Sequence, residues 1–219
     1  MGETEIRREI FLEGPLYLDP APGTRLDWAQ VFGRRAPVLI DIGAARARYF
    51  LNIGPHLPEV DLVGVEVAKK RVEKALEKLA EAGLGARSRM VWGDAFGFIR
   101  DHVASGSVAA ITVLFPDPWP KKRHAKRRIF QQPDTAALFA RALAPGGLLL
   151  VKTDAQAYFG PMCANFGACS LFEPTTDLAV RVPGLAGFSL DRPEETKYEA
   201  KWKAEGRAMY LAAFRRLPT

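Results

Sequence analysis

The sequence predicts an α/β fold in which helices cover both faces of a mostly parallel β-sheet. Short apolar runs recur along the chain from residue 37 onward, and stretches with helical spacing of apolar residues lie between them. Strands that alternate with helices form right-handed βαβ units, whose sheets are buried on both faces. In addition, nearly every predicted strand ends at an acidic residue.

The elements are assigned from apolar runs and from helical spacing. Strands are expected over residues 38–42, 61–67, 89–92, 108–115, 148–153 and, antiparallel to the others, 207–215. Helices are expected over residues 46–53, 69–82 and 135–144, with a short amphipathic piece at 28–32. The run 108–115 is the most apolar, which favours a central strand, and Gly83 fits a C-terminal helix cap.

Length and composition favour one soluble domain. The chain has 219 residues, of which 48% are hydrophobic and 26% are charged. Residues 1–35 are interpreted as an N-terminal arm that packs on a domain formed by residues 36–219. Two cysteines exclude a disulfide scaffold, and the three histidines lack metal-ligand spacing, so no metal is expected. Apolar runs are too short to span a membrane, which indicates a cytoplasmic protein, either monomer or homodimer.

The positive charge is concentrated in the octapeptide KKRHAKRR at residues 121–128. The chain carries 31 basic and 25 acidic residues, and the octapeptide alone holds six lysines or arginines and no acid, which equals the whole excess. A focused cationic patch attracts polyanions, and each neutralised phosphate releases counterions. A solvated loop is the alternative interpretation. The octapeptide therefore predicts contact with a phosphate backbone.

Acidic residues follow the predicted strands at the edge where parallel sheets bind ligands. Gly43 suits a tight turn after the first strand. Glu66, 23 residues later, is at the position where an acid binds the two hydroxyls of a ribose. The alternative is that Glu66 only stabilises the start of a helix. Asp94 suits an adenine amino group or a helix cap. Together with Asp117, in a turn stiffened by prolines, and Asp154, these residues outline a nucleoside pocket.

The segment FPDPWPKKRHAKRRI, residues 115–129, resembles the signature of the bacterial tRNA (guanine-N7-)-methyltransferases of the TrmB type. Three further pieces occur in the expected order: VLIDIG before Ala44, Thr153-Asp154, and TKYE at residues 196–199, where the family has a TKFE-like motif. The resemblance covers roughly residues 36–215. It implies a class I Rossmann-like methyltransferase fold, S-adenosylmethionine as cofactor, and methylation of a tRNA at N7 of a guanosine in the variable loop.

The resemblance also implies roles for single residues. Cofactor contacts are expected at Asp41, Glu66 and Asp94, beside the turn at Gly43, and at Asp117, which is also the expected catalytic or substrate-orienting residue. Substrate contacts are expected at Lys121, Asp154, Thr196, Lys197, Tyr198 and Glu199. RNA contacts are expected at Arg123, His124, Lys126, Arg127 and Arg128.

The loop after the first strand departs from the family pattern. Family members usually carry G-x-G-x-G, whereas here Ala45 and Ala47 flank Arg46. Alanine adds a methyl group where the backbone approaches the cofactor, and it disfavours positive φ. Either the loop shifts slightly and still binds cofactor, which we favour, or the protein is a non-catalytic RNA-binding member with a weakened cofactor site. A nicotinamide-dependent oxidoreductase ranks last, because a pyrophosphate would need the missing glycines.

Overall fold

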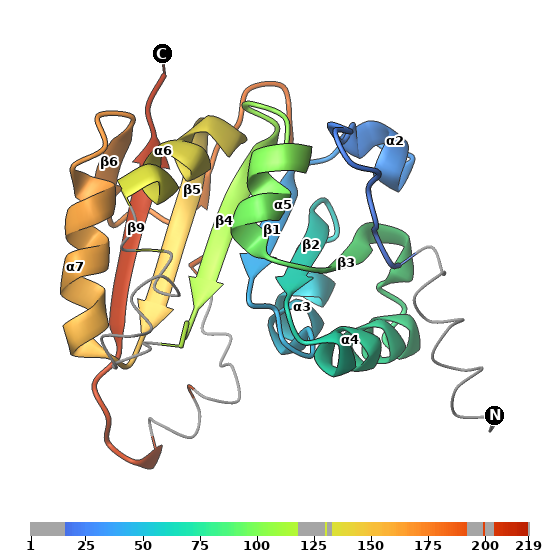
Figure 1. Cartoon of the computed structure of the whole chain (residues 1–219), viewed down its shortest axis with the longest axis horizontal. Coiled ribbons are helices and arrows are strands. Elements are labelled where there is room, and N and C mark those ends of the chain that lie inside the picture. Colours follow the sequence, from blue (N-terminus) through green and yellow to red (C-terminus); the bar gives the residue numbers. More distant parts are fainter. Residues whose placement is uncertain (1–15, 118–129, 131–132, 192–198, 200–203, 219) are drawn as a thin grey trace.

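The computed structural model describes residues 16–117, 130, 133–191, 199 and 204–218. Within these residues, seven strands form one sheet in the order β3-β2-β1-β4-β5-β9-β6 (Figure 1). The strands are β1 (Val38–Ile42), β2 (Asp61–Glu66), β3 (Ser88–Trp92), β4 (Val108–Leu114), β5 (Leu143–Thr153), β6 (Phe172–Thr175) and β9 (Tyr210–Arg216), with a separate pair of β7 (Ala179–Val180) and β8 (Phe188–Ser189). The helices are α2 (Trp28–Phe32), α3 (Arg48–Ile53), α4 (Lys69–Glu81), α5 (Ala95–His102), α6 (Pro133–Ala142) and α7 (Gln156–Gly167), with short 3-10 turns at Gly54–His56 and Gly85–Arg87.

The sheet is mostly parallel, as predicted. Strands β1 to β5 run in one direction, and β9 pairs antiparallel with β5. The antiparallel C-terminal strand and the central position of β4 are therefore confirmed. Strands β2 and β3 lie on one side of β1, whereas β4 and β5 lie on the other. This reversal of strand order opens a crevice at the carboxyl ends of the strands, where ligands bind in such folds.

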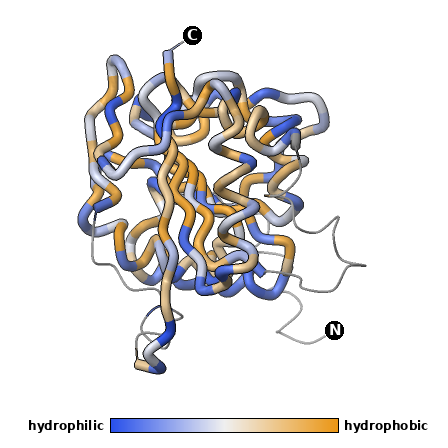
Figure 2. The backbone as a smooth tube through the Cα atoms, turned by 90° about the vertical axis from the view of Figure 1, so that its left-hand side faces the viewer, coloured by the Kyte–Doolittle hydropathy of each residue, from blue (hydrophilic) through white to orange (hydrophobic). Residues whose placement is uncertain are grey.

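Helices cover both faces of the sheet, and each face has its own core (Figure 1). On one face, α2, α5, α6 and α7 bury side chains such as Phe98 and Phe139 against the strands. On the other face, α3, α4 and the β7–β8 pair bury Phe50 and Leu76. In Figure 2 the strands at the centre of the molecule are coloured mostly orange, which marks hydrophobic residues. Each fully buried side chain of this size stabilises the fold by about 1.5–3 kcal/mol.

The junction between α6 and β5 differs from the prediction. The helix ends at Ala142, two residues earlier than expected, and β5 begins at Leu143 rather than Leu148. The first residue of β5 pairs with β4, and the register then shifts. A Cβ added to Gly147 would lie 2.8 and 2.9 Å from two main-chain carbonyl oxygens. The Pro-Gly-Gly segment therefore lies inside an irregular strand, because the missing side chains let it pass close to β4.

The sequence patterns missed two helices, α5 and α7, and the short strands β6, β7 and β8. Helix α7 contains Gly160 and Pro161, which indicate a helix break when only the sequence is considered. Its residues Tyr158, Met162 and Phe166 are nevertheless buried against the sheet. Tertiary packing thus outweighs the local preference, as it often does.

The described part of the N-terminal arm lies against β3 and α5. The Leu18 N–H donates to the Met90 carbonyl at 2.9 Å, and the Leu26 N–H donates to the His102 carbonyl at 2.8 Å. The side chains of α2 join the main core. Residues 16–35 therefore share the core of the domain, and the division between residues 1–35 and 36–219 remains a prediction.

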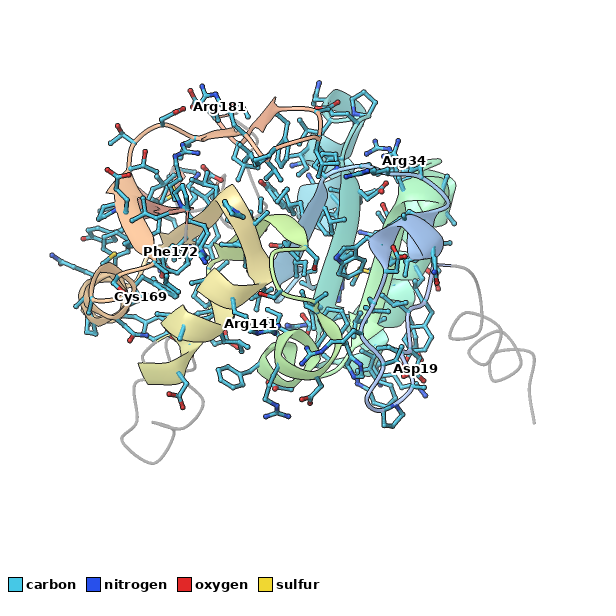
Figure 3. The ribbon with its side chains drawn as sticks, turned by 90° about the horizontal axis from the view of Figure 1, so that it is seen from above. Asp19, Arg34, Arg141, Cys169, Phe172 and Arg181 are labelled. Atoms are coloured by element: carbon cyan, nitrogen blue, oxygen red, sulfur yellow. The ribbon has the colours of Figure 1, made fainter. Side chains whose placement is uncertain are left out.

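At the amino edge of the sheet, seen from above in Figure 3, Arg34 and Arg141 bind carboxylate and carbonyl groups of the protein itself. The Arg34 Nε donates to Asp61 at 2.8 Å, and Arg141 donates to the carbonyls of Ile99 and Val103 at 2.7 and 2.9 Å. Burial raises the pKa of the Asp61 carboxyl, although Arg34 opposes this effect. The guanidinium groups of Arg34 and Arg141 at this edge therefore serve the fold.

Candidate active site

The predicted site acids gather at the carboxyl edge of the sheet. Asp41 lies near the end of β1 and Glu66 ends β2, while Asp94, Asp117 and Asp154 follow β3, β4 and β5. Because these five strands are parallel and adjacent, all five acids share one edge. Glu66 and Asp117 are thus on the same edge of the molecule, as the nucleoside-pocket hypothesis requires.

The loop after β1 has the backbone of a glycine-rich turn. Gly43, Ala45 and Ala47 adopt φ values of 76°, 49° and 54°. This left-handed conformation costs a non-glycine residue about 1–3 kcal/mol. The Gly43 N–H donates to the Val65 carbonyl at 2.9 Å, which fixes the loop on β2. Because Ala47 is in the left-handed conformation, α3 begins only at Arg48, two residues later than predicted.

Glu66 joins the loops that follow β1 and β2. Its Oε2 accepts the Ala45 N–H at 3.0 Å, and its Oε1 accepts the Ala68 N–H at 2.9 Å. The Arg71 Nη1 lies 3.6 Å from Oε2 of Glu66. Glu66 itself is only 4% exposed. An ionised carboxylate has about four lone-pair positions, so two remain for hydroxyl donors. The predicted diol acceptor therefore also holds the loop in place.

Asp41 lies beneath the loop, and its environment opposes ionisation. The side chain is 3% exposed, and Oδ1 accepts the Thr112 hydroxyl of β4 at 2.7 Å. Burial, together with the nearby charge of Glu66, raises the pKa of Asp41 to about 7, while the Thr112 hydrogen bond lowers it. Asp41 therefore changes charge near neutral pH. Thr112 was missed by the sequence patterns, because it is a single hydroxyl in an apolar strand.

We expect Asp41→Asn to change how stability depends on pH. Burial raises the folded-state pKa above the unfolded-state value, so the folded protein binds this proton more tightly. The contribution of Asp41 to the free energy of unfolding is full below about pH 4 and falls by about 1.4 kcal/mol per unit as the pH rises toward 7. Urea unfolding of both proteins between about pH 4 and 8 measures this difference.

The stability of the wild type should therefore fall relative to Asp41→Asn across that range, because asparagine stays neutral and still accepts from Thr112. Asp101→Asn serves as a control, since Asp101 is exposed and its pKa is lowered by hydrogen bonding to Arg100. Parallel stability curves for the wild type and Asp41→Asn would contradict the assignment.

Asp94 caps a helix. Its Oδ2 accepts the Gly97 N–H of α5 at 2.6 Å, and the side chain is otherwise exposed. The capping alternative is thereby confirmed, and the contact with an adenine amino group remains a prediction.

Asp117 follows a strained turn at the end of β4. Phe115 has a φ of 53°, and its N–H donates to the Lys152 carbonyl at 2.7 Å. A bulky residue in this conformation is uncommon, and such strain is often stored at functional sites. Asp117 itself is exposed at the edge beside β1. Its contact with the cofactor or with a bound base remains a prediction.

Lys152 and Glu199 form an ion pair at the end of β5. The side chains are 20% and 5% exposed, so the pair is largely removed from water. It lies at a cavity of about 90 Å³ on the α3 side of the sheet. Apolar side chains from α3, β4, β5 and β9 and polar groups near β8 line the rest of the cavity, among them Tyr49, Leu114, Leu150, Leu211, Ser189 and Asp191.

Asp154 is half-buried beside a cation that the sequence patterns missed. The Arg207 Nη1 lies 3.6 Å from Asp154 Oδ2, and Arg207 also pairs with Glu205 at 2.9 Å. Lys152 was missed as well, although its position is distinctive. It is the one charged residue in the run 148–153. A charge in an otherwise apolar strand, directly before Thr153-Asp154, is the signal that points to it.

The amino-acid sequence of the chain is similar to those of a known protein family. The family described as "Putative methyltransferase" matches residues 35–212. A tRNA (guanine-N(7)-)-methyltransferase of Leifsonia xyli is 37% identical over 199 residues, which is 90% of this chain and 83% of that protein. The Bordetella parapertussis enzyme of the same name is 38% identical over 87% of this chain and 72% of its own length.

The chain belongs to the tRNA (guanine-N(7)-)-methyltransferase family. A relative of the same name from Mycobacterium sp. strain KMS is also 38% identical, and the chain spans 64% of its length.

Solved structures support the fold alone. The 16S rRNA methyltransferase KamB superposes with a TM-score of 0.60 at 16% identity, over 92% of this chain and all of that chain. TrmN from Thermus thermophilus superposes with a TM-score of 0.56 at 15% identity, over 86% of this chain and 47% of that chain. The predicted class I Rossmann-like methyltransferase fold is thereby confirmed.

Several residues of the family motifs lie outside the described residues. They are Lys121, Arg123, His124, Lys126, Arg127, Arg128, Thr196, Lys197 and Tyr198. Within the residues that the structure describes, no group of three or more His, Cys, Asp or Glu side chains is placed to hold a metal ion. In the same part of the chain, no helix is both long and apolar enough to cross a membrane.

We expect Ala45→Gly to stabilise the protein, because this residue takes the left-handed conformation that the family pattern assigns to glycine. Relief of the strain should exceed the added flexibility of the unfolded chain and raise the free energy of unfolding by about 0.5–1 kcal/mol. Ala80→Gly, at an exposed position inside α4, is the matched control and should lower it by about 1 kcal/mol. A loss of stability in both variants would refute the strain argument.

Proposed function

We propose that this protein transfers a methyl group from S-adenosylmethionine to N7 of a guanosine in the variable loop of a tRNA. Family membership carries the proposal, since relatives that are 37–38% identical to this chain over the aligned residues are named tRNA (guanine-N(7)-)-methyltransferases. The carboxyl edge of the sheet supports it with acids at five successive strand ends.

The residues at this edge fit the cofactor. A Cβ placed on Gly43 or Gly93 would meet no atom within 4 Å, so the turns after β1 and β3 border open space. Glu66 retains acceptor positions for the two ribose hydroxyls. Asp94 follows β3 with an exposed carboxylate, whose Oδ1 we infer accepts from the adenine amino group. When bound, S-adenosylmethionine supplies an electrophilic methyl group on its sulfonium.

The protein then has to position the base rather than deprotonate it. The N7 lone pair of guanine lies in the plane of the ring and is available without a general base, so alignment of the two reactants accounts for most of the expected rate. Positive charge develops on the base as the bond forms. We infer that the Asp117 carboxylate, exposed at the carboxyl edge, stabilises this charge or accepts from the N–H edge of the base.

The experiment uses unmodified tRNA transcripts and S-adenosylmethionine with a labelled methyl group. We expect label in the tRNA, and digestion should recover it as N7-methylguanosine. Calorimetry with S-adenosylmethionine alone tests the alternative of a non-catalytic RNA-binding protein. Binding of tRNA with neither methyl transfer nor cofactor binding would favour that alternative and overturn the proposal.

A further inference from the structure

A second group of cations lies on the carboxyl edge, apart from the octapeptide in the sequence. Arg46 and Arg48 come from the loop after β1 and the start of α3, and Lys69, Lys70 and Arg71 form the first turn of α4. All five are exposed. We call these five residues the α4 basic surface. They contribute five positive charges within two short segments.

The two segments meet around Glu66. The Arg71 guanidinium approaches Oε2 of this carboxylate at 3.6 Å, and the same oxygen accepts the N–H of Ala45, the residue directly before Arg46. Helices α3 and α4 lie side by side at this edge (Figure 1). The five cations therefore form one surface, and Glu66, which is buried below it, compensates a single charge.

The stability of α4 does not explain why its first turn is basic. The first turn of α4 holds no acid, and its N-cap, Ala68, provides no side-chain cap. Cations at the N-terminus of a helix oppose the helix dipole and are destabilising. The side chains of Arg46, Arg48 and Lys70 form neither hydrogen bonds nor ion pairs with any residue that the structure describes. Arg34 and Arg141 at the amino edge, in contrast, bind internal carboxylate and carbonyl groups.

An exposed aromatic ring lies within this surface. Trp92, at the end of β3, is 45% exposed, and its Nε1 donates to the Val67 carbonyl at 3.0 Å. The Lys69 Nζ lies 5.2 Å from the centre of the ring, and Val67 is 67% exposed. Cations with an exposed aromatic side chain are the combination that binds unpaired nucleotides, through phosphate contacts and base stacking.

We propose that the α4 basic surface and Trp92 bind the RNA substrate, as a contact additional to the octapeptide. The octapeptide follows β4 in the sequence, whereas α4 follows β2, on the other side of β1. This inference rests on the proposed function, because it takes a tRNA as the substrate.

The test measures tRNA affinity of the full-length chain at several salt concentrations. In Lys69→Ala/Lys70→Ala, we expect the Kd for an unmodified tRNA transcript to rise about 5- to 30-fold, and the slope of log K against log salt to fall by about 1–2. The Kd for S-adenosylmethionine should not rise, because removing cations does not weaken binding of a sulfonium. The Tm should stay equal or increase.

Two further variants sharpen the test. Lys78→Ala/Arg100→Ala removes two charges near the other ends of α4 and α5, and should leave the Kd and the salt slope unchanged. Trp92→Leu should weaken tRNA binding without changing the salt slope, since stacking releases no counterions.

The outcomes separate this inference from the proposed function. Absence of methyl transfer by the wild type would overturn the proposed function itself. Normal methyl transfer with a Kd and salt slope in Lys69→Ala/Lys70→Ala equal to those of the wild type would overturn only the second RNA surface. A parallel loss of S-adenosylmethionine affinity would assign the lysines to the cofactor site and would also overturn it.

Discussion

Asp117→Ala should lower kcat about 100- to 1,000-fold, the size expected when one preorganised electrostatic group is removed from a site. The reason is its position, exposed at the carboxyl edge directly after the strained turn at Phe115. Affinity for tRNA should change by less than about threefold, because phosphate contacts supply most of the binding. Single-turnover methylation and equilibrium tRNA binding measure the two effects separately.

The control for Asp117 is Asp101→Ala, which removes an exposed acid at the end of α5, near the opposite edge of the sheet. It should leave both quantities unchanged. Equal losses of rate and of tRNA affinity in Asp117→Ala would show that Asp117 binds RNA rather than acting on the reacting base.

Lys152→Met should lower the free energy of unfolding by about 3–5 kcal/mol, because it removes the cation that pairs with a largely buried carboxylate. Glu199 is only 5% exposed and pairs with Lys152 at the end of β5. Lys152→Arg retains the charge and should restore most of the stability. Urea unfolding of the wild type and both variants measures the difference in the free energy of unfolding. Activity at saturating tRNA shows whether Lys152 also orients Glu199 toward the substrate.

Lys74→Ala provides the comparison for Lys152. Lys74 pairs with Glu77 on the surface, where the two side chains are 52% and 32% exposed, so its loss should change stability little. The double variant Lys152→Met/Glu199→Leu should recover stability, since both charges are removed together. A cost for Lys152→Met no greater than that for Lys74→Ala would refute the buried-pair argument.

Much of the site was predictable because the relevant signals are local. Glu66, Asp94, Asp117 and Asp154 follow apolar runs, and parallel strands bring such positions to one edge. The alanines at positions 45 and 47 were identified as a departure, but their conformation was not predictable. The structure shows both in the left-handed region. The Ala45 N–H donates to Glu66 at the end of β2 and the Ala47 N–H donates to the Ala44 carbonyl within the loop, contacts that no sequence pattern reveals.

The alternation of strands and helices, the edge on which the acids lie and the family resemblance could all be predicted, since each depends on residues close together in the chain. Which side chains meet depends instead on the tertiary fold. Asp41 and Thr112 are 71 positions apart, and Lys152 and Glu199 are 47 apart. Strand order and register bring these pairs into contact, and burial at the contact raises the pKa of Asp41. Both effects arise from packing between segments that are distant in the sequence.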